Sequence, residues 1–205
     1  MAGCCNATDY RRFFNRKFAR RDLDRYRRRG LAATERDLVT LCGNVDGATI
    51  LEVGGGIGAL QLELLDAGAA AATNVELSGG YEEAAAELFA GRERVERVVA
   101  DFVEADVAPH DIVVLHRVVC CYPDVDALVG AAARAARREL VLTYPQERRW
   151  IGWGLQAVNL WLRLRGCGFR TYQHSFDSIA TAAADMRVDR RLARGVLWES
   201  AAFER

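Results

Sequence analysis

The sequence of 205 residues is poor in several residue types. It has a single lysine (Lys17), three prolines and six cysteines, and no two cysteines form a Cys-x-x-Cys pair. This cysteine spacing fits neither a zinc ribbon nor the disulfide framework of a small secreted protein. The longest apolar run without a charge, residues 150–162, is too short to span a bilayer. The N-terminus lacks the apolar core of a signal peptide, so we expect a cytoplasmic protein.

The sequence also has no excess of either charge, because 28 basic residues balance 28 acidic ones. Hydrophobic residues make up 51% of the chain. This composition excludes a disordered chain and a uniformly basic coat for nucleic acid. The length fits one domain with a sizeable core. The balance conceals a segregation of charge, since residues 1–30 carry a net charge of +7, residues 31–139 of −11 and residues 140–205 of +4.

The centre of the chain alternates short apolar segments with helical patterns. We expect strands over residues 48–53, 72–77, 95–100, 110–115 and 139–144. Helices are expected over residues 59–67, 81–90 and 125–136. Strands separated by helical patterns of this length predict βαβ crossovers and a mainly parallel α/β sheet.

The two ends of the chain follow other patterns. Residues 9–30 predict one arginine-rich helix that stops at Gly30, and residues 34–42 predict a second helix capped by Thr34. Near the C-terminus we expect helices over 150–165 and 176–186, then a hairpin of strands 188–193 and 196–203. We therefore expect an N-terminal helical cap, residues 1–45, on a domain of residues 46–205 with a helical insertion at about 148–170.

A glycine-rich loop follows the first predicted strand and precedes a predicted helix. It contains Gly54, Gly55, Gly56 and Gly58. Glycine lets the backbone turn tightly and approach a ligand closely, and a helix start offers unpaired N–H groups. The loop fits a dinucleotide as well as another nucleoside ligand, and a purely structural turn is a further alternative.

Carboxylates at the strand ends distinguish these alternatives. Glu52 precedes the loop by two residues, where an acid suits an ammonium group and repels a pyrophosphate. Glu76 ends the second strand, the place where a carboxylate binds both hydroxyls of a ribose. Asp101 and Phe102 end the third strand and suit the edge and face of an adenine.

This series resembles the class I S-adenosylmethionine-dependent methyltransferases. The family's glycine motif matches residues 52–58, its ribose acid matches Glu76, and its adenine contacts match Asp101 and Phe102. Leu77 and Leu115, at the ends of their strands, complete the cofactor site that the likeness implies. The resemblance implies a Rossmann-like seven-stranded sheet, mainly parallel with a C-terminal antiparallel hairpin, and S-adenosylmethionine as cofactor. It implies no metal.

Within that family the sequence is most similar to the magnesium-protoporphyrin IX methyltransferase group. The similarity rests on His116 and Tyr122, which follow the fourth strand, and on Tyr172 and His174, which precede the last helix. The likeness implies O-methylation of a carboxylate on a small-molecule acceptor, and a hydroxyl is the alternative. His116, His174 and Tyr122 are the candidate catalytic residues, although a structural, hydrogen-bonded role for each histidine stays open.

Two segments have several interpretations. The tryptophan-rich stretch of residues 150–164 has three alternative roles: it caps a large apolar acceptor, it touches a membrane surface, or it packs on the sheet. The basic head, residues 1–30, is either a lid whose Tyr26, Arg27 or Arg29 reaches the carboxylate of the cofactor, a handle for an anionic substrate or RNA, or a solvated surface. An RNA-modifying methyltransferase and a non-catalytic S-adenosylmethionine-binding module are therefore the alternative functions. The sequence does not indicate an oligomeric state.

Overall fold

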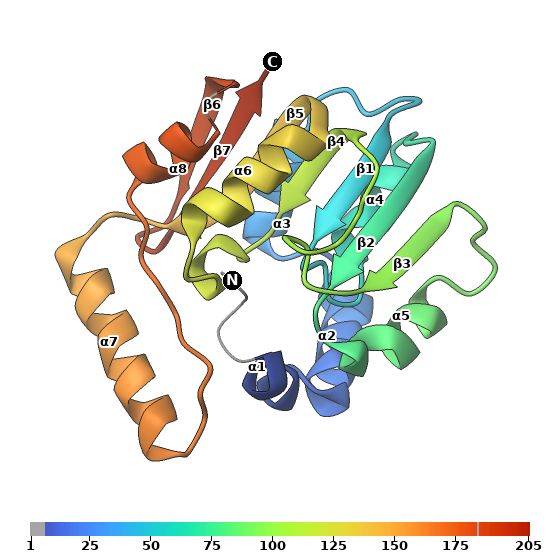
Figure 1. Ribbon diagram of the computed structural model, residues 1–205. Coiled ribbons are helices and arrows are strands. Elements are labelled where there is room, and N and C mark those ends of the chain that lie inside the picture. The colour runs from blue at the N-terminus through green and yellow to red at the C-terminus, as the bar shows by residue number, and fades with distance from the viewer. Residues whose placement is uncertain (1–6, 184) are drawn as a thin grey trace.

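Seven strands form one mixed sheet with helices on both faces in the computed structural model, which describes residues 7–183 and 185–205 (Figure 1). The strand order is β3-β2-β1-β4-β5-β7-β6. The strands are β1 (Thr49–Val53), β2 (Ala71–Glu76), β3 (Val95–Val99), β4 (His110–Leu115), β5 (Ala136–Pro145), β6 (Arg187–Arg194) and β7 (Trp198–Glu204). The strands β1 to β5 run parallel, and β7 pairs antiparallel with β5 and β6. The predicted mainly parallel sheet with a terminal hairpin is confirmed.

The helices form two layers. They are α1 (Ala7–Phe13), α2 (Arg16–Arg29), α3 (Ala33–Leu41), α4 (Ala59–Asp66), α5 (Glu82–Leu88), α6 (Val125–Ala135), α7 (Arg149–Leu164) and α8 (Phe176–Ala182), with the short 3-10 helices η1 (Gly79–Tyr81) and η2 (Val119–Cys121). One apolar core joins α2, α3 and α4 to one face of the sheet, and a second joins α6 and α8 to the other. Because both faces are covered, the central strands are apolar almost throughout.

The N-terminal segment differs from the single helix expected over residues 9–30. It forms two helices, α1 and α2, separated at Asn15. The Asn15 side chain accepts hydrogen bonds from the backbone N–H groups of Lys17 and Phe18, and so caps α2. A cap of this kind starts a new helix inside an otherwise continuous helical pattern. Cys4 and Cys5 lie outside the described residues.

The interpretation that the tryptophan-rich stretch packs on the sheet is wrong. The helix that it forms, α7, lies at the edge of the molecule, apart from the helices that cover the sheet (Figure 1). Its buried residues are Ile151 and Leu162, whereas Trp150, Trp153 and Trp161 are exposed. Among the described residues no helix has the length and apolarity to cross a bilayer.

The C-terminal elements follow the prediction with shifted bounds. The last helix, α8, ends at Ala182 rather than at residue 186. The hairpin turns at Gly195, whose φ of 60° lies in the left-handed region. The fifth strand begins directly after α6 and is longer than expected. These changes leave the carboxyl ends of β1, β2, β3 and β4 at one edge of the sheet, where parallel α/β sheets bind ligands.

Candidate functional site

The glycine loop connects β1 to α4 in the conformation that its glycines allow. Gly54, Gly56 and Gly58 have φ values of 63°, 56° and 82°, in the left-handed region that side chains disfavour. Gly58 precedes the first turn of α4, and the Gly54 N–H donates to the carbonyl of Val75 on β2. The loop therefore brings the N-terminal end of α4 to the carboxyl edge of the sheet, as expected for a nucleoside site.

Glu76 ends β2 and is joined to the glycine loop. Its Oε2 accepts a hydrogen bond of 3.0 Å from the Gly56 N–H, and its Oε1 accepts one of 2.9 Å from the Ser78 N–H. Burial raises the pKa of this carboxyl, and the two N–H donors oppose that rise. Glu76 thus couples the loop to the segment after β2, at the position expected for the ribose acid.

Glu52 lies under the loop in a cluster of buried polar groups. Its Oε2 and the side-chain amides of Gln61 and Asn74 are buried and have no hydrogen-bond partner among the described residues. A Cβ added at Gly55 would lie 2.4 Å from Asn74 Nδ2 and 2.5 Å from Glu52 Cδ, so a glycine is required above the cluster. Buried polar atoms without partners mark a place where a ligand or water completes the hydrogen bonding.

The Glu52 carboxyl has an unusual protonation equilibrium. Its burial, assisted by the nearby Glu35, raises its pKa to about 8. A buried carboxyl of this kind is neutral at pH 7 until a positive charge stabilises its ionised form. The cluster therefore fits a cationic ligand group, such as the ammonium of S-adenosylmethionine.

A cleft adjoins the loop at the carboxyl ends of β1, β2 and β3. It is lined by Tyr10, Val53, Gly54, Val75, Leu77, Ala100, Asp101, Phe102, Val118, Cys121, Tyr122 and Leu128. The Asp101 carboxylate accepts a hydrogen bond of 3.1 Å from the Val103 N–H. Phe102 and Tyr122 are buried, and apolar side chains form most of the wall. The cleft thus combines an apolar slot with a carboxylate, which suits a purine base.

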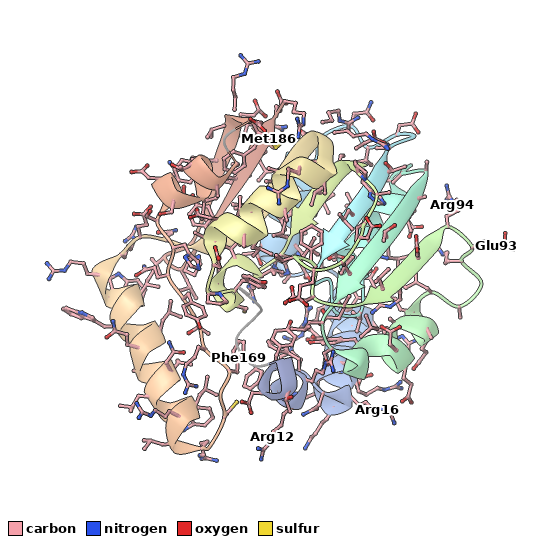
Figure 2. The ribbon with its side chains drawn as sticks, viewed as in Figure 1. Arg12, Arg16, Glu93, Arg94, Phe169 and Met186 are labelled. Atoms are coloured by element: carbon pink, nitrogen blue, oxygen red, sulfur yellow. The ribbon has the colours of Figure 1, made fainter. Side chains whose placement is uncertain are left out.

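The N-terminal segment covers this cleft. Tyr10 on α1 lines it, and the Arg11 Nε donates to the carbonyl of Leu77. Tyr10, Phe13 and Phe14 meet Phe169, which follows α7 and is buried, and Figure 2 shows Phe169 next to α1. The role of Tyr10 was not predicted, because nothing in the sequence links this aromatic residue to a site that forms far along the chain.

Other predicted site residues lie away from the cleft lining. Leu115 is fully buried at the end of β4, within the core. The Tyr26 hydroxyl donates to Glu63 on α4 at 2.8 Å, and Arg29 is exposed in the last turn of α2. Of the described residues, neither Tyr26 nor Arg29 lines the cleft.

His116 follows β4 and is enclosed by residues from α3. Its Nε2 lies 2.9 Å from the Thr34 hydroxyl, and its Nδ1 lies 3.8 Å from Glu35 Oε1. Arg117 donates to the Thr34 oxygen, so the Thr34 hydrogen is available to donate to Nε2. Burial lowers the pKa of His116 to about 3, assisted by Arg117 and Arg25. His116 is therefore a neutral, hydrogen-bonded imidazole at physiological pH.

His174 and Tyr122 lie together beside the cleft. The His174 Nε2 donates to the backbone carbonyl of Tyr122 at 2.9 Å, and its ring stacks on Tyr172. The Tyr122 hydroxyl lies 3.4 Å from Asp101 Oδ1, to which it donates. Cys120 and Cys121, whose sulfur atoms lie 3.7 Å apart, precede this tyrosine, and Cys121 lines the cleft. The structure therefore brings together His174, Tyr122 and Asp101, but not His116.

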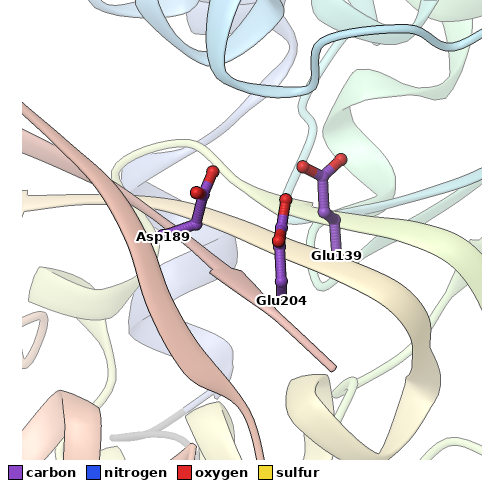
Figure 3. Close-up of side chains that lie close together, drawn as sticks. All are labelled: Glu139, Asp189 and Glu204. Atoms are coloured by element: carbon purple, nitrogen blue, oxygen red, sulfur yellow. The ribbon is translucent and has the colours of Figure 1, made fainter.

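A separate group of carboxylates lies at the opposite edge of the sheet. Glu139, Asp189 and Glu204 come from β5, β6 and β7 and are close neighbours (Figure 3). Arg190 pairs with both Glu139 and Asp189. This cluster lies near the start of β5, away from the carboxyl ends of the parallel strands, and is separate from the cleft.

Known proteins share both the sequence pattern and the fold. Residues 51–142 match the model of a family described as a methyltransferase domain. No curated protein matches the chain in sequence. The magnesium protoporphyrin IX methyltransferase of Synechocystis PCC 6803, solved with bound S-adenosylhomocysteine, is similar in structure, with a TM-score of 0.70 and 21% identity over 97% of this chain and 99% of that one.

Two further structures have the same fold at lower identity. One is a methyltransferase of Haloferax volcanii in complex with the Trm112 methyltransferase activator, with a TM-score of 0.68 and 13% identity over 92% of this chain and 94% of that one. The other is the geranyl diphosphate C-methyltransferase of Streptomyces coelicolor A3(2), with a TM-score of 0.65 and 13% identity over 84% and 77%.

The family match covers the glycine loop and the candidate site residues Glu52, Glu76, Asp101 and Phe102. The buried polar cluster under the loop fits the cationic end of the cofactor, and the cleft fits its adenine end. Residues 51–142 therefore form a methyltransferase domain, and the whole chain has the fold of S-adenosylmethionine-dependent methyltransferases.

Proposed function

We propose that this methyltransferase methylates an oxygen of a small-molecule acceptor, and that the oxygen belongs to a carboxylate. The observation that carries the proposal is the position of His116: its Nε2 faces the Thr34 hydroxyl of α3, and it is not among the described residues that line the cleft. An imidazole with a pKa near 3, hydrogen-bonded through Nε2 to Thr34, is too weak a base to deprotonate an alcohol or an amine at neutral pH. A carboxylate needs no base, because it is ionised at pH 7.

In this mechanism the protein chiefly positions the cofactor and the acceptor relative to each other. S-adenosylmethionine, when bound, supplies a methyl group on a sulfonium. Glu52, Glu76 and Asp101 would hold the cofactor, and the loop glycines would let it approach the backbone. The acceptor oxygen must then lie in line with the methyl carbon at about 3 Å. Transfer would form the O–C bond of a methyl ester and break the S–C bond, which would leave the sulfur as an uncharged thioether.

Tyr122 and His174 are the proposed positioning residues. The His174 Nε2–H fixes the backbone of Tyr122, and the Tyr122 hydroxyl contacts Asp101. Cys121 and Val118 form the wall between these residues and the glycine loop. We propose that this side of the cleft receives the acceptor, which is apolar apart from its carboxylate. Magnesium protoporphyrin IX, the substrate in the name of a structurally similar enzyme, is an acceptor of that chemistry.

The basic head supports this proposal over RNA modification. Arg20 and Arg27 both pair with Glu87 on α5, and Arg25 pairs with Glu35. These contacts join the head to its own domain. A polynucleotide substrate would instead require an affinity that falls steeply as the salt concentration rises.

Transfer of a labelled methyl group to a panel of apolar carboxylic acids, alcohols and amines tests the proposal. We expect labelled methyl esters and, at saturating S-adenosylmethionine, a rate that stays level between about pH 6 and 9 because the acceptor remains ionised. The variant His116→Gln should keep kcat within about threefold, and His174→Gln should lower kcat/KM. Methylation of alcohols or amines alone, with a rate that rises with pH, would contradict the proposal.

A further inference from the structure

The helix α7 has two different sides. Ile151 and Leu162 are buried on one side, where the Asn159 side chain also bonds the backbone of Thr171 at 2.8 Å. This side packs on the segment that returns from α7 towards the cleft. At about 100° per residue, a second apolar set falls on the opposite side of the helix. That set consists of Trp150, Trp153, Ala157, Leu160, Trp161 and Leu164.

This second side, which we call the tryptophan face, is open to solvent. Its large members are at least half exposed, from 50% for Trp150 to 77% for Leu164. A contiguous exposed stripe of this kind is unusual in a globular protein and marks an interaction surface. Since it lies opposite the packed side, it points away from the return segment and so away from the cleft.

Cations border the tryptophan face. The stretch of residues 148–170 holds five arginines and no acidic residue. The Arg149 guanidinium lies 5.9 Å from the ring centre of Trp153, and the Arg165 guanidinium lies 5.0 Å from that of Trp161. Two copies joined through this face would bring arginines together without acidic partners. An anionic lipid surface supplies the complementary charge, and tryptophan prefers the boundary between lipid headgroups and acyl chains.

We propose that α7 is an interfacial helix that docks the protein on an anionic bilayer, with the tryptophan face in the headgroup region and the arginines on lipid phosphates. The inference goes beyond the methyl-transfer reaction and does not depend on the acceptor. The return segment runs from α7 to Tyr172, whose N–H donates to the Cys120 carbonyl beside the cleft. Docking would therefore place α7 and its return segment between the membrane and the Cys121 and Tyr122 side of the cleft.

Vesicle flotation of the full chain tests the proposal. Vesicles of phosphatidylcholine alone are compared with vesicles that also contain phosphatidylglycerol. We expect binding to the anionic vesicles that weakens severalfold in high salt. The double variant Trp153→Glu, Leu164→Glu should bind at least tenfold more weakly. The matched control is the double variant Val196→Glu, Leu197→Glu, which places the same two charges on exposed apolar residues of the hairpin turn and should bind as the unaltered chain does.

A second variant keeps the test independent of folding. Replacing Arg149, Arg163 and Arg165 by glutamine leaves the apolar face intact and should lower binding to anionic vesicles severalfold. Circular dichroism and the affinity for S-adenosylhomocysteine report whether each variant is folded. A folded, unaltered chain that floats with neither vesicle overturns the proposal. So does a concentration-dependent dimer that the Trp153→Glu, Leu164→Glu variant abolishes, because the face would then join two copies.

Discussion

At the scale of single residues, the two buried glutamates of the candidate cofactor site differ in their hydrogen bonding. Glu76 has a hydrogen-bond donor for each carboxylate oxygen, from Gly56 and Ser78, and is held in one orientation. Glu52 has an oxygen without a partner among the described residues, and its pKa lies near 8. One carboxylate is thus prepared to accept hydrogen bonds from hydroxyls, and the other to respond to a positive charge.

Removing the Glu76 carboxylate should weaken cofactor binding. In Glu76→Ala the Gly56 N–H loses its acceptor and the ribose hydroxyls lose theirs, so we expect at least a tenfold higher Kd for S-adenosylhomocysteine. Isothermal calorimetry measures this change. The control is Glu93→Ala, on the exposed turn before β3. Equal affinities for the two variants would show that Glu76 is not the ribose acid.

The raised pKa of Glu52 predicts that cofactor binding releases a proton. At pH 7 the carboxyl is mostly protonated, because its pKa is about 8 rather than its ordinary 4.5. A bound cation favours the ionised form and lowers that pKa, so a proton leaves to the buffer. The heat of S-adenosylmethionine binding at pH 7 should therefore vary with the ionisation enthalpy of the buffer. In Glu52→Gln this variation should vanish, and its persistence would assign the proton to another group.

At the scale of elements, the N-terminal helices are seated on the loop after β2. The junction of α1 and α2 at Asn15 lies against Gly80, where an added Cβ would be 3.0 Å from the Asn15 Cα. The neighbouring Gly79 would bring its Cβ no nearer than 3.8 Å to Val99. Of these two adjacent glycines of η1, Gly80 therefore lies against the basic head and Gly79 does not.

This pair gives a matched test of how the head is docked. Gly80→Ala should lower the free energy of unfolding by about 1–3 kcal/mol, because the backbone at Asn15 must move away. Gly79→Ala should change it by less than about 0.5 kcal/mol. Urea unfolding measures both, and limited proteolysis after Arg11 and Arg12 reports release of α1. Equal effects would show that the head does not rest on Gly80.

The roof of the cleft depends on a contact between α1 and the return segment of α7. The rings of Phe13 and Phe169 stack with centroids 5.0 Å apart. A double-mutant cycle with alanine at both positions should give a coupling free energy of about 0.5–1.5 kcal/mol in urea unfolding. The control cycle pairs Phe13 with Phe176, which stacks on Tyr144 instead and should show no coupling. A zero value in the first cycle would mean that the two segments move independently.

Elements that follow local rules were predictable from the sequence, and contacts between distant segments were not. The glycine loop and each acid follow from the local spacing within their own βα unit. The structure places Glu52, Glu76 and Asp101 at or just after the ends of β1, β2 and β3. The break at Asn15 is hidden inside a helical pattern. The environment of His116 depends on Thr34 and Glu35, about 80 residues away in the chain, and only the tertiary structure brings them together.

At the scale of the whole molecule, cofactor binding and folding are linked. The candidate site draws on β1, β2, the segments after β3 and β4, α6 and the N-terminal helix α1, so it exists only when the sheet and the head are assembled. A ligand of the folded state alone stabilises that state by mass action. The opposite charges of the head and the central region support the same assembly, through pairs such as those of Arg20 and Arg27 with Glu87.

S-adenosylhomocysteine at about 100 times its Kd should therefore stabilise the fold by ~2.7 kcal/mol. For a chain of this size, that corresponds to a rise in Tm of roughly 5–11 °C. Differential scanning calorimetry measures the shift. The Glu76→Ala variant at the same ligand concentration should show a clearly smaller rise in Tm. An equal rise in Tm would show that the ligand does not stabilise the fold through Glu76.

The outermost strand of the sheet, β6, also affects whether two molecules can associate edge to edge. All its residues are exposed, and Arg187, Arg190, Arg191 and Arg194 are among them. An unpaired edge strand is a template on which a further strand can add, and aggregation starts from such edges. A second β6 laid against the first would set arginines against arginines. The sheet thus ends in a strand that repels its own copy, which protects the protein from growing into fibrils at high concentration.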